Sequence, residues 1–121
     1  MKHLIFTLLM FISCSNCVHA QSNYYMNQAN NYMRDVEYYN KKAQGYEREA
    51  DYYNRKAQDY LREVEYYTRR GNTDKAKMNN KWAQDATEKA RMQMRWAQDA
   101  REKAQMRLKW AQDAMEKANR R

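Results

Sequence analysis

Proline is absent from the sequence, and glycine occurs only twice, at Gly45 and Gly71. Both residue types interrupt helices, so their scarcity in a chain of 121 residues permits very long helices. The abundant residues are Ala, Gln, Glu, Lys and Arg, which is the composition of long helices. We therefore expect an all-α protein.

Cysteine and histidine occur twice each, and all of them lie at positions 1–20. Beyond them no thiol or imidazole remains, and Ser22 is the only serine. These absences exclude a Ser/His/Asp or Cys/His catalytic set, an imidazole or thiolate metal site and a glycine-rich phosphate loop. We expect no enzymatic activity, no cofactor and no small-molecule substrate.

The segment at positions 1–20 has the pattern of an export signal. A short basic start at residues 2–3 precedes an apolar run at 4–12, and Val18-His19-Ala20 forms a small-residue cleavage site before Gln21. The apolar run is too short to span a bilayer. We therefore predict a signal peptide at 1–20 and a secreted or periplasmic protein.

Cys14 offers an alternative mode of processing. Cleavage before Cys14, with a lipid attached to its sulfur, would anchor the chain to a membrane. The preceding residues Phe11-Ile12-Ser13 resemble a lipobox but lack its usual leucine. Cleavage after Ala20 is the preferred interpretation.

Tyrosine recurs every seventh residue in the first half of the chain, and alanine does so in the second half. Alanine or valine follows most of these tyrosines by four residues, so steps of four and three alternate, as at the a and d positions of a heptad repeat. The two columns are Tyr25, Tyr32, Tyr39, Tyr46, Tyr53, Tyr60 and Tyr67, and Ala76, Ala83, Ala90, Ala97, Ala104, Ala111 and Ala118. They predict the seam through which two long helices pack.

The two columns are out of phase by five residues at the middle of the chain. The first rhythm would continue at Gly71, whereas the second begins at Ala76. Five residues turn the packing face of a helix by about 140°, and coiled coils absorb only insertions of three or four residues smoothly. Residues 69–74 supply basic residues for a helix end, Gly71 for a left-handed cap, and Asn, Thr and Asp for a new helix start. We therefore predict a turn at 71–74.

Folding the chain back at this turn sets every column tyrosine against an alanine, from Tyr67 with Ala76 to Tyr25 with Ala118. Large residues against small ones favour close packing. The sequence therefore predicts an antiparallel coiled-coil helical hairpin, with helices at about 22–70 and 73–120. One long or kinked helix within a bundle is the alternative. The seam also contains polar residues, which can fix the register: Asn79, Gln93 and Arg107.

The predicted organisation has four parts. A signal peptide at 1–20 precedes a first helical arm at 21–70, the turn at 71–74 and a second arm at 75–121. Both arms repeat with a period of two heptads, so duplication preserves the seam. Acid and base four residues apart recur with this period and predict intrahelical pairs: Glu37 with Lys41, Asp51 with Arg55, Glu65 with Arg69, Asp85 with Lys89, Asp99 with Lys103, and Asp113 with Lys117.

The second arm carries a flank of tryptophan and methionine beside the alanine column. We name this set the tryptophan flank: Trp82, Trp96, Trp110, Met78, Met92 and Met106. Tryptophans about 21 Å apart along a helix are costly to leave in water, so we expect another chain, the folded-back arm or a ligand to cover them. Packing in a homo-oligomer is the preferred interpretation, and a platform for sugar, lipid or peptide is the alternative.

The first arm carries a basic column on its outer face. Its residues recur every seventh position: Arg34, Lys41, Arg48, Arg55, Arg62 and Arg69. With a net charge of +8, the chain could bind a polyanionic surface such as a glycan, an anionic lipid or a nucleic acid. A second set of tyrosines lies off the seam and could instead be cross-linked in a secreted matrix: Tyr24, Tyr38, Tyr52 and Tyr66.

The alanine column and the basic end at 117–121 resemble the alanine-zipper rods of bacterial murein lipoproteins. The likeness is limited to this packing pattern, because the tyrosine column and the terminal Arg121 depart from it. The sequence as a whole favours an exported, non-enzymatic structural or adaptor protein that self-associates through its helices. Polyanion binding is the second interpretation, and a tyrosine-rich matrix protein is the third.

Overall fold

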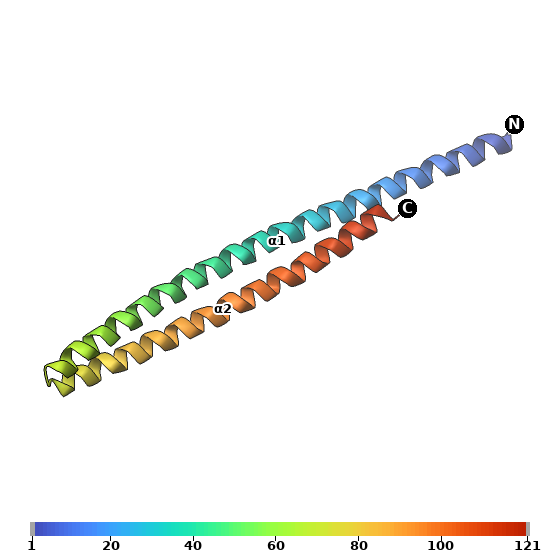
Figure 1. Ribbon diagram of the computed structural model, residues 1–121. Helices are drawn as coiled ribbons and strands as arrows, with labels where there is room; N and C mark the ends of the chain where they lie inside the picture. Colours follow the sequence, from blue (N-terminus) through green and yellow to red (C-terminus); the bar gives the residue numbers. More distant parts are fainter. Residues whose placement is uncertain (1, 121) are drawn as a thin grey trace. The chain divides into compact units, whose positions relative to one another are not determined.

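The protein is an all-helical hairpin of two helices, as the sequence predicts (Figure 1). The computed structural model describes the backbone of residues 2–120 and the side chains of residues 19–120. Helix α1 spans Lys2–Arg69 and helix α2 spans Thr73–Asn119. Within the described backbone there is no strand.

Helix α1 begins at Lys2, earlier than the start expected near residue 22. Neither proline nor glycine lies between Lys2 and Gly45, so the backbone has no helix-breaking residue at which to stop. Most of the predicted signal peptide and the side chain of Cys14 lie outside the described side chains. No helix in the described part of the chain is long and apolar enough to cross a membrane.

The turn between the helices is fixed by backbone hydrogen bonds and a single left-handed residue. Gly71 has φ 74°, which only glycine adopts without strain. The amide of Asn72 donates to the carbonyl of Tyr67 at 2.9 Å, and that of Gly71 donates to Thr68 at 3.1 Å, forming a Schellman cap. The Asn72 side chain then accepts a hydrogen bond from the amide of Lys75 at 3.2 Å and caps the start of α2.

The chain divides into two compact units. The turn unit is Tyr39–Glu102 and contains the C-terminal part of α1, the turn and the N-terminal part of α2. Here the helices run antiparallel on either side of the turn, and Arg101 of α2 forms a bidentate pair with Glu47 of α1 at 2.8 and 2.9 Å.

The end unit combines Met1–Tyr38 with Lys103–Arg121. The C-terminal part of α2 lies beside α1 here (Figure 1). The hydroxyl of Ser22 donates to the carbonyl of Ala118 at 3.1 Å, and Arg107 lies 3.8 Å from the carboxylate of Asp35.

Alanine dominates the core in both units. All the buried hydrophobic side chains among the described residues are alanines, and no large side chain is fully buried. The seven alanines of the second-arm column are buried, whereas the seven column tyrosines are half-buried. The helices therefore meet through methyl groups, and the tyrosine rings lie at the margin of the contact.

Candidate interaction surface

Each tryptophan of α2 packs against a tyrosine ring of α1. In the turn unit, the ring centroids of Tyr60 and Trp82 lie 5.7 Å apart, as do those of Tyr46 and Trp96. In the end unit, Tyr32 and Trp110 lie at the same separation of 5.7 Å. Aromatic pairs at this distance and inclination are favourable. The folded-back arm therefore covers part of each tryptophan.

Lysines contact the tyrosines that lie between these aromatic pairs. Lys75 lies over the ring of Tyr67 at 5.2 Å, and Lys89 over that of Tyr53 at 5.6 Å. In the end unit, Lys117 lies 5.8 Å from the ring centroid of its tyrosine, Tyr25. Tryptophan and lysine thus alternate along α2 as the neighbours of the tyrosine column, which the two-heptad repeat explains.

Two charge pairs predicted within α2 are not formed. No ion pair among the described side chains joins Asp85 to Lys89 or Asp113 to Lys117, because both lysines turn toward tyrosine rings of α1. Spacing along one helix cannot reveal a competing partner on the other helix. In α1 the predicted pairs Asp51–Arg55 and Glu65–Arg69 are present.

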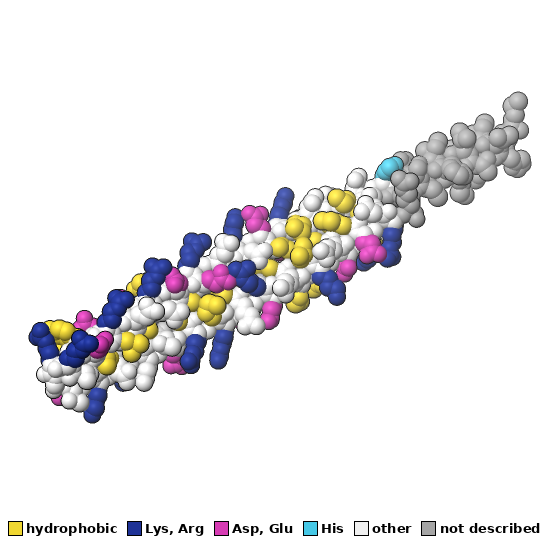
Figure 2. Space-filling model, in the orientation of Figure 1, with side chains coloured by type: hydrophobic (Ala, Val, Ile, Leu, Met, Phe, Trp, Pro, Cys, Tyr) yellow, Lys and Arg dark blue, Asp and Glu magenta, His cyan; other side chains and the backbone are white. Residues whose placement is uncertain are grey.

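The tryptophan flank remains partly open after these contacts. Trp82, Trp96 and Trp110 are 43%, 43% and 38% exposed. Met78, Met92 and Met106 are exposed too, and each precedes a tryptophan by four residues, so the two share a helix face. Hydrophobic side chains are visible between rows of Lys and Arg in Figure 2.

A pocket of about 230 Å³ lies beside Trp82 in the turn unit. We name it the tryptophan pocket, lined mainly by Tyr53, Lys56, Tyr60, Trp82, Asp85 and Lys89. A hydrogen bond with Tyr52 raises the pKa of the Lys56 ammonium, which also lies 5.4 Å from the Tyr52 ring centroid. The pocket therefore presents aromatic rings, two lysine side chains and one carboxylate.

The three polar residues predicted in the seam have different surroundings. Asn79 is buried, and its amide donates to the carbonyl of Lys75 at 2.9 Å. Arg107 lies 4.5 Å from the ring of Trp110 and pairs with Asp35. The Oε1 atom of Gln93 is buried and accepts no hydrogen bond from any of the described residues, a costly arrangement in a packed interface.

The basic column of α1 is partly neutralised by neighbouring acids. Arg55, Arg62 and Arg69 each form an exposed ion pair with a carboxylate three or four residues earlier. The side chain of Lys41 is not free either, because it takes part in a noncovalent contact. The off-seam tyrosines Tyr24, Tyr38, Tyr52 and Tyr66 are exposed. A polyanion at this column would compete with the acids already present.

Sequence reasoning missed an apolar edge in the end unit. We name it the methionine edge, formed by Met26, Met33, Leu108 and Met115. Three of these side chains are exposed, and Met115 is half-buried. Each follows a seam position by one residue. That spacing could have predicted an apolar edge beside the seam. In the turn unit the equivalent heptad positions are mixed: Leu61 and Met94 are exposed there too, whereas Glu47 and Arg101 form the bidentate ion pair.

The contacts on this surface are aromatic, cation–π and ionic. No group of three or more His, Cys, Asp or Glu side chains that could hold a metal ion occurs in the part of the chain that the structure describes. Neither a family model, nor a curated protein, nor a solved structure matches the chain. Its function is therefore inferred from the residues themselves.

Proposed function

We propose that the protein is an exported, non-enzymatic coiled-coil hairpin that acts as a structural or adaptor element by self-association. The observation that supports this is the alanine core. Alanine buries little apolar area, whereas many large hydrophobic side chains remain exposed. Association with a second copy would remove that surface from water and stabilise a narrow hairpin.

The methionine edge is the surface that we propose for this association. Met26, Met33 and Leu108 are exposed in the same unit. No Asp, Glu, Lys or Arg occupies this heptad position in the end unit. Methionine adapts to irregular partner surfaces. The tryptophan flank, proposed from the sequence for the same role, already contacts tyrosines of its own chain.

Export is proposed from the sequence of the segment at 1–20. What supports it in the fold is the position of Ser22, which bonds to Ala118 close to the C-terminal end of α2 at Asn119. Pairing with α2 is thus present two residues after the predicted cleavage site. Removal of residues 1–20 would leave this hydrogen bond in place.

Sedimentation equilibrium on the chain that starts at Gln21 tests self-association. We expect an oligomer whose melting temperature rises with protein concentration. Met33→Glu should weaken association by about tenfold or more, because it places a charge in an apolar contact. Asn31→Glu adds the same charge at an exposed polar position of α1 and should have little effect.

Two results would count against the proposal. A chain that stays monomeric up to millimolar concentration would remove self-association as its mode of action. Equal effects of Met33→Glu and Asn31→Glu would show that the methionine edge is not the contact.

A further inference from the structure

We propose that the tryptophan pocket is one of a repeated set of binding sites for a linear glycan that carries carboxylated sugars. This inference goes beyond self-association, since it uses the other flank of the seam. It rests on the repetition of the whole pocket and on the chemistry of its lining.

The pocket recurs in the sequence with the two-heptad period. The first-arm residues of the pocket recur fourteen positions earlier in the sequence, and its second-arm residues recur fourteen positions later. All six residue types are the same in this second set: Tyr39, Lys42, Tyr46, Trp96, Asp99 and Lys103. A further shift gives Tyr25, Gln28, Tyr32, Trp110, Asp113 and Lys117, with one change. The first set lies wholly in the turn unit and the third wholly in the end unit, so each unit contains one complete set with residues from both arms.

The geometry also repeats where the two units can be compared. The Tyr–Trp separation is 5.7 Å in the turn unit and 5.7 Å in the end unit. The Lys–Tyr separation is 5.6 Å in the first and 5.8 Å in the second. The same aromatic and cationic groups are therefore presented in the same way in both units.

The acids of the repeat are not explained by packing. Asp85 and Asp113 are exposed, and in the described part of the chain they accept no hydrogen bond and form no ion pair. The lysines four residues later, Lys89 and Lys117, contact tyrosine rings instead. Each copy thus keeps one carboxylate available as an acceptor beside a cation and an aromatic face.

This combination of groups fits a sugar ring better than a nucleotide. Partly exposed tryptophan and tyrosine offer an apolar surface for the C–H face of a pyranose, lysine can bind a carboxylate, and aspartate can accept from hydroxyls. The residues common to all copies include one Lys and one Asp, so each copy offers a cation for the carboxylate and an acceptor for the hydroxyls of one sugar ring.

The size of the pocket indicates a polymer as the ligand. At about 230 Å³ it is smaller than the pockets of roughly 300–1,000 Å³ that enclose a drug-sized molecule. One pocket suits a single ring, with weak affinity. Several copies on one molecule would raise the affinity for a chain that offers several rings.

Titration with polygalacturonate, monitored by tryptophan fluorescence, tests the proposal directly. All three tryptophans lie in copies of the pocket, so binding should change their emission. The fully methyl-esterified polymer is the matched control, because it keeps the sugar backbone and loses the carboxylates. We expect the acid polymer to bind and the ester to bind about tenfold more weakly.

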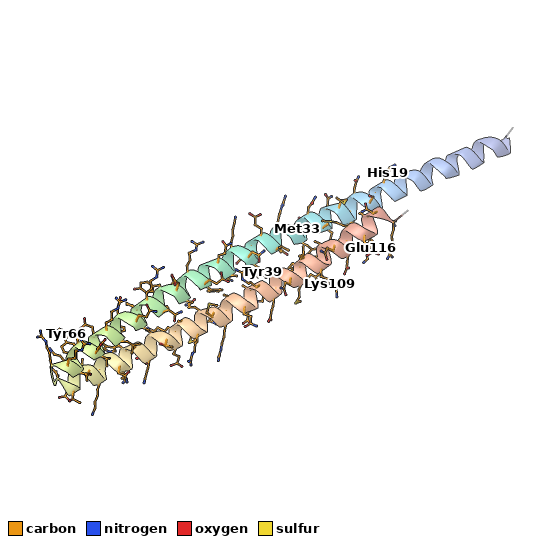
Figure 3. The ribbon with its side chains drawn as sticks, in the orientation of Figure 1. His19, Met33, Tyr39, Tyr66, Lys109 and Glu116 are labelled. Atoms are coloured by element: carbon orange, nitrogen blue, oxygen red, sulfur yellow. The ribbon has the colours of Figure 1, made fainter. Side chains whose placement is uncertain are left out.

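A pair of double variants separates the pocket from general electrostatics. Lys89→Gln and Lys117→Gln together remove one pocket lysine from the copy in each unit. The control variant removes two other exposed charges, by Lys81→Gln and Lys109→Gln. The side chain of Lys109 points away from α1 in Figure 3. We expect about tenfold or greater loss for the pocket variant and little loss for the control.

Several outcomes would overturn the proposal. Equal losses in the two variants would assign the binding to net charge alone, and equal binding of acid and ester would remove the role of lysine. Tighter binding of single-stranded oligothymidylate would identify the pocket as a nucleic-acid site. Should the pocket variant unfold, the single substitutions Lys89→Gln and Lys81→Gln make the same comparison with less change to the chain. Met33→Glu should leave glycan binding unchanged, so failure here is distinguishable from failure of self-association.

Discussion

At the scale of single residues, the seam depends on side chains that are small. Ala97 is 1% exposed and belongs to the column that the tyrosines of α1 flank. A methyl group lets two helices approach closely, whereas a larger group forces them apart or into strained rotamers. The stability of the hairpin should therefore be more sensitive to added volume at alanine than to lost charge at the surface.

We predict that Ala97→Leu lowers the free energy of unfolding by about 1–3 kcal/mol, through overpacking. Urea unfolding followed by circular dichroism measures the change. Arg55→Ala is the control, because it breaks only an exposed ion pair with Asp51 and should cost less than about 0.5 kcal/mol. An unchanged or raised stability for Ala97→Leu would mean that the helices are not closely packed at this alanine.

A substitution at Gln93 should instead raise the free energy of unfolding. Its buried Oε1 atom has no hydrogen-bond partner in the part of the chain that the structure describes, and such an atom costs about 1–3 kcal/mol. Gln93→Met keeps the length of the side chain and removes the polar atom, so the free energy of unfolding should rise by about 1 kcal/mol or more. Gln58→Met, at an exposed position of α1, should change it little. A loss of stability at Gln93 alone would indicate that its amide makes a hydrogen bond in solution.

The sequence predicted the positions of the tryptophans beside the alanine column but not all of their neighbours. A spacing of one or two heptads shows which side chains share a helix face. It does not show that Lys89 prefers the ring of Tyr53 to the carboxylate of Asp85, because that choice depends on the other helix. The pocket beside Trp82 was missed for the same reason, since its lining comes from both helices.

At the scale of the secondary-structure elements, the turn illustrates what local sequence can specify. The five-residue change of phase, Gly71 and the capping residues together predicted where α1 ends and α2 begins. Their backbone conformations are set by near neighbours, as the hydrogen bonds of Gly71 and Asn72 show. The start of α1 was predicted less well, because a cleavage signal marks a processing site and not a helix boundary.

The two glycines should respond in opposite ways to substitution by alanine. Gly71 has φ 74°, so Gly71→Ala should lower the free energy of unfolding by about 1–2 kcal/mol. Gly45 lies within α1 with open space around it, so Gly45→Ala should raise it by about 0.5–1 kcal/mol. Thermal melting of both variants measures the difference. Similar shifts in the two would show that the turn is not formed at Gly71 in solution.

At the scale of the whole molecule, processing and assembly are the features that the fold alone does not define. Hydrophobic side chains are exposed in both units, although the chain as a whole carries a net charge of +8. A net positive charge favours contacts with acidic partners. Self-association and glycan binding are proposed for different flanks and need not exclude each other.

We predict that the chain is exported and that cleavage leaves Gln21 as its first residue. Intact-mass spectrometry of material recovered after secretion measures this directly. A mass corresponding to a chain that begins at Cys14 with attached lipid would establish anchoring instead. The hydrogen bond of Ser22 with Ala118 should be retained in either product.

The polar residues of the seam determine how the two arms align with each other. Successive two-heptad blocks are near copies, so an arm displaced by one block would meet almost the same partners. The polar residues of the seam differ from block to block: Asn79, Gln93 and Arg107. Displacement by one block would place Gln93 opposite Val64 and Arg107 opposite Ala50. A chain of identical blocks would have several alignments of similar energy and could join neighbours in staggered overlaps of undefined length. Three unlike residues in otherwise uniform blocks give this chain one preferred alignment.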